Sequence, residues 1–202
     1  MVSPVLSAAL FTALIGATAI ERLVEVRVSL RNAAWALARG GVEHGRGHYP
    51  FMVLLHTGFL LACVAEVWLL DRPFLPALGF PALVLALLCQ GLRWWCIHSL
   101  GPRWNTRVIV VPDLPPIRDR GPYRYLRHPN YLVVVTEGLA LPLVHSAWIT
   151  ALSFTVLNAV LLWVRIGVEE RALREAQPPG ESRLSPPATA GAARGRSEPR
   201  AG

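Results

Sequence analysis

The sequence predicts an all-α integral membrane protein with about five transmembrane helices, the last two forming a helical hairpin. The chain has 202 residues, of which 53% are hydrophobic and only 16% charged, whereas soluble domains average about 25% charged residues. Its apolar residues come in long blocks and do not alternate with polar ones. All 20 basic side chains are arginines, most of them near the ends of these blocks. This composition excludes soluble globular, disordered and coiled-coil chains.

The first three apolar blocks are long enough to cross a membrane. A helix needs about 20 apolar residues to cross a hydrocarbon core of about 30 Å. Residues 2–20 meet that length, and nothing basic precedes them, so we expect a span here and not a cleaved signal peptide. Two more spans are expected at 51–70 and 74–92, separated by a polar turn with a proline.

The last two blocks, 131–144 and 147–164, are separated only by His145 and Ser146. So short a break predicts a tight helical hairpin. Between the first and second spans, residues 21–39 mix apolar side chains with arginine and glutamate. This pattern predicts either a helix along the membrane surface or an extension of the first span.

Arginine positions predict the orientation in the membrane. Five arginines lie in residues 21–50, seven in 93–130 and seven from 165 onward, while the opposite loops carry only Arg72, which follows Asp71. Cytoplasmic loops carry an excess of arginine and lysine. We therefore expect the amino terminus outside and the carboxyl terminus in the cytoplasm.

A polar motif lies directly before the final hairpin and reads Gly121-Pro-Tyr-Arg-Tyr-Leu-Arg-His-Pro-Asn-Tyr131. The His128-Pro129 pair predicts an extended residue followed by a helix start, because proline disfavours helical geometry in its predecessor and suits the first helical turn. Free N–H groups at such a start can hold a carboxylate or another polar ligand. We interpret the run from His128 to Tyr131 as a ligand site. The nearby arginines, by contrast, are better interpreted as markers of the membrane interface.

A second polar motif follows the last span and reads Arg165-Ile-Gly-Val-Glu-Glu-Arg-Ala-Leu173. Arg165 and Glu169 are four residues apart, so on a helix they share a face. Taken alone, the pattern fits a solvated ion pair at a helix end as well as it fits a functional site.

Polar residues also occur inside the apolar blocks, where ionisable groups are costly and usually face the bundle interior. Glu137 follows Tyr131 by six residues and is a candidate contact of the site. We expect His56 and Glu66 to make hydrogen bonds between helices. The three cysteines have no metal-ligand spacing, so we expect them in the core and expect no metal site.

Together, the two motifs resemble the isoprenylcysteine carboxyl methyltransferase family, integral-membrane enzymes that use S-adenosyl-L-methionine (S-adenosylmethionine). The resemblance covers about residues 80–175 and includes the hairpin between the motifs. It implies a cofactor pocket under the last helices, open to the cytoplasm. By this resemblance the cofactor-binding residues are Tyr123, His128, Pro129, Asn130 and Tyr131. It likewise implies that the catalytic residues, facing the methyl acceptor and the sulfonium, are Arg165, Glu169 and Glu170.

The amino-terminal half resembles a bacterial branch of this family that is linked to type III polyketide synthases and O-methylates alkylpyrones or alkylresorcinols. The resemblance is carried by Glu21-Arg-Leu, Arg31-Asn32, Gly40-Gly-Val-Glu43, His48-Tyr-Pro-Phe-Met52 and His56. It implies a lipophilic small-molecule acceptor, a functional link to a polyketide synthase and a place in a bacterial inner membrane. The expected partners are this acceptor and membrane lipids, with no nucleic acid.

The resemblance divides the chain into four expected regions. The first span with an interfacial helix occupies residues 1–50, and the second and third spans occupy 51–97. A methyltransferase-like cofactor-binding region with the final hairpin occupies 98–176. The tail, 177–202, is rich in Pro, Gly, Ala, Ser and Arg and is expected to be disordered.

Four alternatives remain open at this point. The acceptor can be an isoprenylcysteine carboxylate, or the amine of a phospholipid in a related N-methyltransferase. A sterol-reductase-like protein would bind NADPH in a similar pocket, although the two adjacent glutamates argue against a site for its extra phosphate. A membrane scaffold without enzymatic activity would use both motifs only as interface anchors.

Overall fold

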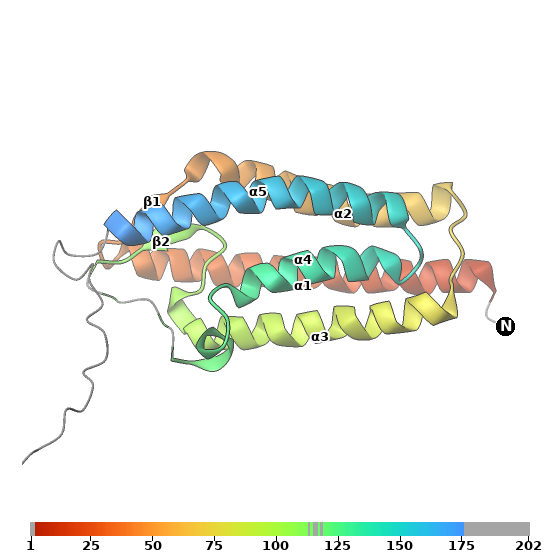
Figure 1. The fold of residues 1–202 in the computed structure, drawn as a ribbon, viewed down its shortest axis with the longest axis horizontal. Helices are drawn as coiled ribbons and strands as arrows, with labels where there is room; N and C mark the ends of the chain where they lie inside the picture. Colours follow the sequence, from red (N-terminus) through yellow and green to blue (C-terminus); the bar gives the residue numbers. More distant parts are fainter. Residues whose placement is uncertain (1–2, 113, 115–116, 118, 176–202) are drawn as a thin grey trace, which may run out of the picture.

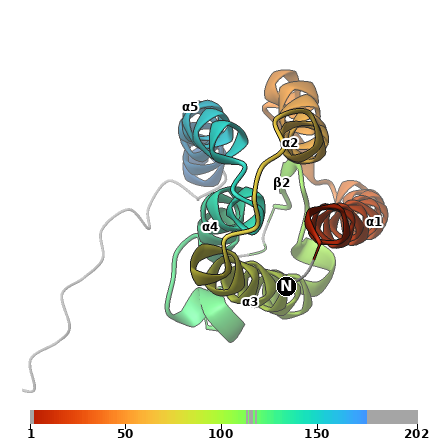
Figure 2. The same ribbon diagram turned by 90° about the vertical axis from the view of Figure 1, so that its right-hand side faces the viewer.

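In the part of the chain that the structure describes, five α-helices run side by side along the long axis of the molecule (Figure 1). The computed structural model describes residues 3–112, 114, 117 and 119–175, and the tail expected to be disordered lies outside the described residues. Figure 2 shows the bundle end-on, with α4 next to α3 and α5, as the packing contacts also indicate. The helices are α1 (Pro4–Leu37), α2 (Tyr49–Leu69), α3 (Pro76–Leu100), α4 (Pro129–Leu143) and α5 (Trp148–Glu175).

The first helix is continuous, so the segment 21–39 extends the first span and does not form a separate surface helix. Its second half places polar residues on one face, because Glu25, Ser29 and Asn32 follow one another at helical spacing. All three are 3–4% exposed and face the bundle, whereas Leu23 on the opposite side is 70% exposed. The helix therefore turns this polar face into the bundle, while its outer side carries exposed apolar residues together with the exposed Arg27 and Arg31.

Four of the helices are long and apolar enough to cross a membrane among the described residues: α1, α2, α3 and α5, two of them together with adjoining 3-10 turns. The sequence predicted five spans. The span predicted at 131–144 is present as α4, but its 15 residues cover only about 22 Å at 1.5 Å per residue. A helix of that length is shorter than a hydrocarbon core of about 30 Å.

The hairpin expected from the break at His145 and Ser146 is present, and α4 and α5 pack against each other. Glu66 caps the start of α5, because its carboxylate accepts hydrogen bonds from the backbone N–H of Ile149 (3.1 Å) and from the backbone N–H of Thr150 (2.7 Å). The Thr150 hydroxyl donates a third bond (2.8 Å). The interhelical bonding expected of Glu66 is thus confirmed.

His56 differs from expectation, since its Nδ1 forms a hydrogen bond with the Met52 carbonyl in its own helix (2.8 Å). Across the helices it contacts the ring of Phe154 edge-on, with centroids 5.4 Å apart. The apolar core lies around this region and toward the hairpin tip, where Phe11, Phe59, Leu141 and Phe154 are buried. The cysteines Cys63, Cys89 and Cys96 are buried and free, as expected.

Glu137 ties three helices together. Its carboxylate accepts hydrogen bonds from Arg22 of α1 (2.8 Å) and from Gln90 of α3 (2.7 Å), and it also pairs with Arg93 of α3. Glu25 completes this buried network by pairing with the same two arginines. Because long charged side chains bridge α1 to α3 and α4, the network fixes α4 relative to its neighbours.

Two short strands join distant segments at one end of the bundle. Strand β1 (Val42–His44) pairs antiparallel with β2 (Val108–Val110), with Glu43 opposite Ile109. Ion pairs of Glu43 with Arg46 (3.1 Å) and Arg107 (3.4 Å) lie beside the strands. The sequence predicted no strand here. The pairing places the segment after α1 beside the segment after α3 at the end where α4 begins.

Candidate active site

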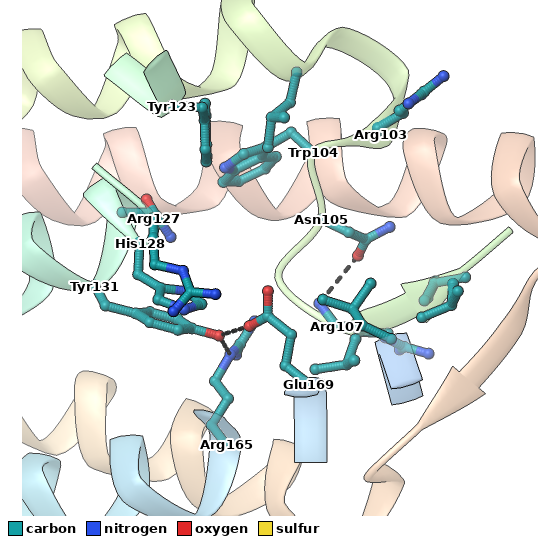
Figure 3. A pocket seen from close by; sticks show the side chains of 16 residues that line it. Arg103, Trp104, Asn105, Arg107, Tyr123, Arg127, His128, Tyr131, Arg165 and Glu169 are labelled. Carbon is teal, nitrogen blue, oxygen red and sulfur yellow. Dashed lines mark hydrogen bonds between the residues drawn. The ribbon is translucent and has the colours of Figure 1, made fainter. Parts of the chain in front are cut away.

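A hollow of about 170 Å³ lies at the end of the bundle where α3 ends and α4 begins. A larger hollow of about 580 Å³ adjoins it and shares ten of its lining residues, among them Tyr123, His128 and Glu169. Figure 3 shows the smaller hollow with Tyr131, Arg165 and Glu169 converging on one side and with Tyr123 and Trp104 on the other. The two polar motifs of the sequence, from α4 and α5, therefore meet at one place.

The contact between the motifs is a pair of hydrogen bonds through one phenol. The Tyr131 hydroxyl donates to Oε2 of Glu169 and accepts from Nε of Arg165 at 3.1 Å. Helical spacing on α5 makes this possible, because Arg165 and Glu169 lie one turn apart on the same face. The hydroxyl of Tyr131 therefore connects a carboxylate to a guanidinium at the wall of the hollow.

Stacked side chains surround this contact. The ring of His128 lies nearly parallel to that of Tyr131, with an interplanar angle of 13° and centroids 5.2 Å apart. The guanidinium carbon of Arg165 is 5.7 Å from the Tyr131 ring centroid, within the range of a cation–π contact. These contacts fix the orientation of the Tyr131 ring.

Arg165 is 7% exposed. Among the described residues, no carboxylate oxygen lies within 4 Å of its guanidinium nitrogens. Its side chain donates hydrogen bonds to the Tyr131 hydroxyl and to the sulfur of Met52 on α2, the latter at 2.7 Å. A thioether is only a weak acceptor. The site therefore holds a buried cation that has no carboxylate within 4 Å in the described part of the chain and that connects to Glu169 through the Tyr131 hydroxyl.

Six of the eight residues that the sequence nominated line the smaller hollow: Tyr123, His128, Asn130, Tyr131, Arg165 and Glu169. Pro129 does not line either hollow; it is buried at the first position of α4, where its ring starts the helix. Glu170 is exposed and lines only the larger hollow. Of the two adjacent glutamates, Glu169 is thus the one that faces the smaller hollow. The roles of all eight residues stay predictions.

Two further expectations changed. Glu137 lines neither of these hollows and belongs to the buried network that bridges α1, α3 and α4. At the start of α4, the N–H groups of Tyr131 and Leu132 both donate to the His128 carbonyl, at 3.1 and 3.2 Å. These two amides are therefore already engaged and do not serve a ligand.

Tyr123 reaches the hollow from a short 3-10 turn, Gly121–Arg124. Gly121 has φ of +51°, and a Cβ atom there would meet Ser99 and Trp95, so glycine is required at this turn. Burial raises the pKa of the Tyr123 phenol, and a hydrogen bond with Cys96 adds to this shift. Its hydroxyl therefore stays neutral at ordinary pH.

Sequence reasoning missed the wall formed by the segment between α3 and β2. Trp104, Asn105 and Arg107 line the smaller hollow, but no periodicity or motif marks them. Trp104 is 3% exposed, and its indole N–H has no hydrogen-bond partner among the described residues. The side-chain oxygen of Asn130 is likewise buried without a described partner. Unsatisfied polar atoms beside a hollow are typical of a ligand site.

Fold and site together define a helical membrane protein with a polar hollow at one end of its bundle. Residues 82–175 match the profile of the Isoprenylcysteine carboxyl methyltransferase (ICMT) family. A Bacillus subtilis relative, the uncharacterized protein YpbQ, is 39% identical over 167 residues, which cover 82% of this chain and 98% of the relative. An uncharacterized Haemophilus influenzae protein is 25% identical over 155 residues, covering 75% of this chain and 88% of that protein. No solved structure matches the chain.

The chain belongs to the isoprenylcysteine carboxyl methyltransferase family. Membership in this family makes it a membrane methyltransferase. Both polar motifs lie inside the matched residues, whereas α1 and α2 lie before them.

Proposed function

We propose that the protein is an S-adenosylmethionine-dependent methyltransferase that O-methylates a lipophilic small molecule of the alkylpyrone or alkylresorcinol type. The observation that carries this proposal is the buried guanidinium of Arg165, which faces the hollow, has no carboxylate within 4 Å in the described part of the chain, and meets Glu169 through the Tyr131 hydroxyl. A buried charge is costly unless a counter-charge compensates it. An acceptor that binds as an oxyanion supplies that counter-charge.

The charge of Arg165 also supports an oxygen acceptor over a nitrogen acceptor. A phospholipid amine binds at least partly as a cation, and a buried guanidinium repels it. An enolic or phenolic hydroxyl ionises readily, and its oxyanion is attracted to the same group. Arginine suits this task because its planar N–H groups hold an oxyanion in a fixed direction.

The residues around the hollow fit S-adenosylmethionine. The ligand is a nucleoside with an amino-acid end, so it offers both donors and acceptors to unsatisfied polar groups such as the Trp104 indole and the Asn130 amide. The two adjoining hollows, about 170 and 580 Å³, reach the size range of small-molecule pockets, about 300–1,000 Å³. The residues proposed to bind S-adenosylmethionine are Tyr123, His128, Asn130 and Tyr131.

When bound, S-adenosylmethionine would supply a methyl group on a cationic sulfur, and this sulfur is the leaving group when a nucleophile takes the methyl group. The protein then has to align the acceptor oxygen, and such positioning supplies much of the lowering of the barrier. Arg165 is proposed to hold the oxyanion. Glu169 is proposed to favour the cationic ligand, and its bond to Tyr131 keeps its carboxylate at the wall of the hollow.

The acceptor's alkyl chain is proposed to enter from the bilayer between helices. Each buried methylene contributes about 0.8 kcal/mol, so a long chain supplies most of the binding free energy without further polar contacts. The link to a polyketide synthase belongs to this proposal, since such enzymes make the acceptor class. Co-expression with a type III polyketide synthase, followed by analysis of methylated lipids, tests that link.

The direct test uses the purified full-length protein and two ligands. Calorimetry with S-adenosylhomocysteine measures cofactor-site binding without an acceptor. Membranes that contain the protein are then incubated with methyl-labelled S-adenosylmethionine and alkylpyrone or alkylresorcinol. We expect binding, and a neutral labelled product that mass spectrometry identifies as the O-methyl ether of the supplied acceptor.

Other products identify the other acceptors. A labelled methyl ester indicates a carboxylate acceptor, which the Arg165 guanidinium would also hold. A labelled phospholipid with the methyl group on nitrogen overturns the argument from Arg165. If the protein binds no S-adenosylhomocysteine, the methyltransferase proposal fails and the scaffold reading replaces it. With binding intact, we expect His128→Ala to weaken it and Arg165→Ala mainly to reduce turnover.

The orientation belongs to the same proposal: the end with the hollow faces the cytoplasm of a bacterial inner membrane, and the amino terminus lies outside. The support is that the segments 21–50, 93–130 and 165–175, which are rich in arginine, lead to this end of the bundle. A reporter enzyme that is active only in the periplasm, fused to the carboxyl end, should remain inactive. Activity of that fusion reverses the orientation.

A further inference from the structure

The buried polar face of α1 contacts the wall of the smaller hollow. This face lies on a helix that precedes the residues matched by the family profile, 82–175. Two of its side chains, Ser29 and Asn32, are each 3% exposed. Neither lines a hollow, so neither touches a ligand there. Their hydrogen bonds all lead to the segment between α3 and β2.

Asn32 holds the backbone of this segment at two points. Its side-chain amide donates to the carbonyl of Trp104 at 2.7 Å and to the carbonyl of Gly101 at 3.1 Å. Gly101 is the first residue of the 3-10 turn that follows α3, Gly101–Arg103, and Trp104 is the residue directly after it. One amide group thus fixes the direction in which the chain leaves α3 and the place from which the Trp104 ring projects.

Ser29 holds the next two residues. Its hydroxyl donates to Oδ1 of Asn105 at 2.7 Å and accepts from the backbone N–H of Thr106 at 3.0 Å. Oδ1 of Asn105 also accepts from the backbone N–H of Arg107 at 3.1 Å. The orientation of Asn105, which lines the hollow, therefore depends on a hydroxyl from α1.

The segment needs this support because it has little regular structure of its own. After the turn at Gly101, the backbone enters strand β2 only at Val108. Between them lie three of the residues that line the hollow, namely Trp104, Asn105 and Arg107. A wall of this kind keeps one shape only if neighbouring elements bond to it, since loops otherwise adopt several conformations.

We propose that Ser29 and Asn32 are positioning residues for the methyl-donor pocket, acting through Trp104 and Asn105, so that α1 is a functional part of the site and not only a membrane anchor. This proposal rests on the proposed function, because it takes the hollow as the S-adenosylmethionine site. It assigns the first helix the task of preorganising the pocket wall before the ligand binds.

The test measures binding of S-adenosylhomocysteine and thermal unfolding in the full-length protein in detergent. Asn32→Asp keeps the size of the side chain but presents a carboxylate to two carbonyl oxygens. Ser29→Ala removes the hydroxyl, whereas Ser29→Thr keeps it and serves as the conservative rescue. The matched control is Thr150→Val, which removes one buried hydroxyl bond, to Glu66, where α5 begins.

We expect Asn32→Asp to weaken binding of S-adenosylhomocysteine by about tenfold or more, and Ser29→Ala by about fivefold, because a lost buried hydrogen bond corresponds to about tenfold in an equilibrium constant. Ser29→Thr should bind close to the unchanged protein. Thr150→Val loses a buried hydrogen bond of the same kind, so it should lower the melting temperature. Because this bond lies at the start of α5, away from the hollow, binding should stay within about twofold.

The outcomes separate this inference from the proposed function. If Asn32→Asp and Ser29→Ala lower the melting temperature yet bind like the unchanged protein, the two side chains are only structural and the inference is overturned. If Asn32→Asp does not fold, the comparison of Ser29→Ala with Ser29→Thr decides by the same measure. If the unchanged protein binds no S-adenosylhomocysteine, the proposed function fails and this inference fails with it.

Discussion

The phenol of Tyr131 donates a hydrogen bond to the carboxylate of Glu169, and this contact joins helix α4 to helix α5 at the hollow. The two residues are 38 positions apart in the chain. Tyr131 closes the first polar motif and Glu169 lies in the second, so one hydroxyl connects both. The contact also fixes the distance between the His128 ring, which stacks on Tyr131, and the acidic side of the hollow.

Removing this hydroxyl tests its importance. In Tyr131→Phe, Glu169 loses a donor and Arg165 loses an acceptor, while the ring remains. A hydrogen bond to a charged group is worth about 1.5–3 kcal/mol, so we expect S-adenosylhomocysteine to bind at least about tenfold more weakly by calorimetry. The control is Tyr125→Phe, since Tyr125 is 73% exposed and lines neither hollow. Equal affinities in both variants would show that the Tyr131 hydroxyl has no part in binding.

The two adjacent glutamates should differ in effect. Glu169 bonds to Tyr131 and lines both hollows, whereas Glu170 is exposed and lines only the larger one. We expect Glu169→Gln to lower methyl transfer from labelled S-adenosylmethionine by about tenfold or more, since it removes a charge beside the site. Glu170→Gln should retain most of the activity. If Glu170→Gln is less active than Glu169→Gln, the functional carboxylate is that of Glu170 and the assignment to Glu169 is wrong.

The buried network around Glu137 should contribute strongly to stability. In Glu137→Leu, Arg22 and Arg93 lose their shared carboxylate inside the bundle. Breaking a buried pair costs about 3–5 kcal/mol, so thermal unfolding in detergent should shift markedly to lower temperature. Arg46→Ala is the comparison: that side chain is 75% exposed in its pair with Glu43, and surface pairs are worth about 0–1 kcal/mol. Similar melting temperatures for the two variants would contradict the role given to Glu137.

Acid should weaken the hairpin tip. His145 lies between α4 and α5, is 2% exposed, and bonds to Ser7 while packing near Phe11 and Phe74. Burial lowers the pKa of its imidazole below 6.5, although backbone hydrogen bonds oppose the shift. The unfolded chain therefore takes up a proton before the folded chain does, and the free energy of unfolding falls as the pH drops below about 6.5.

Unfolding measured between pH 8 and pH 5 should accordingly show a steeper loss of stability in the unchanged protein than in His145→Gln. Other histidines contribute to both curves equally, so the difference between the curves isolates His145. Parallel curves would mean that its protonation is the same in the folded and unfolded chain.

Much of the helical architecture could be predicted from the sequence, because a helix that crosses the lipid needs about 20 mostly apolar residues. Residues 131–144 were predicted as a span, and they form a helix, but the length of α4 is set by where Pro129 begins it and where the turn at Val144 ends it. For residues 21–39, the sequence fits both a surface helix and an extension of the first span. The structure shows the extension, with Glu25, Ser29 and Asn32 facing the bundle. Which face of a helix is inward depends on its neighbours, and a single segment does not contain that information.

The candidate site was predictable where its residues form motifs. His128 and Tyr131 lie at the start of α4, and Arg165 and Glu169 lie in the second half of α5, so a hairpin brings the two pairs toward the same end of the bundle. Trp104 and Asn105 are held by α1, more than 70 positions earlier. A local sequence pattern does not predict a contact between segments so far apart. The pairing of β1 with β2 was missed for the same reason, since three residues are too few to show an alternating pattern.

The shortness of α4 has a further consequence for access. Its hairpin partner α5 has 28 residues against its 15, and the two helices share the tip at one end. The beginning of α4 is therefore recessed along the bundle relative to the end of α5, by roughly 20 Å at 1.5 Å per residue. Of the groups at that beginning, His128, Asn130 and Tyr131 line the smaller hollow. Under the proposed function, a lipophilic acceptor in the adjacent leaflet would reach these groups by moving sideways, without first being lifted into water.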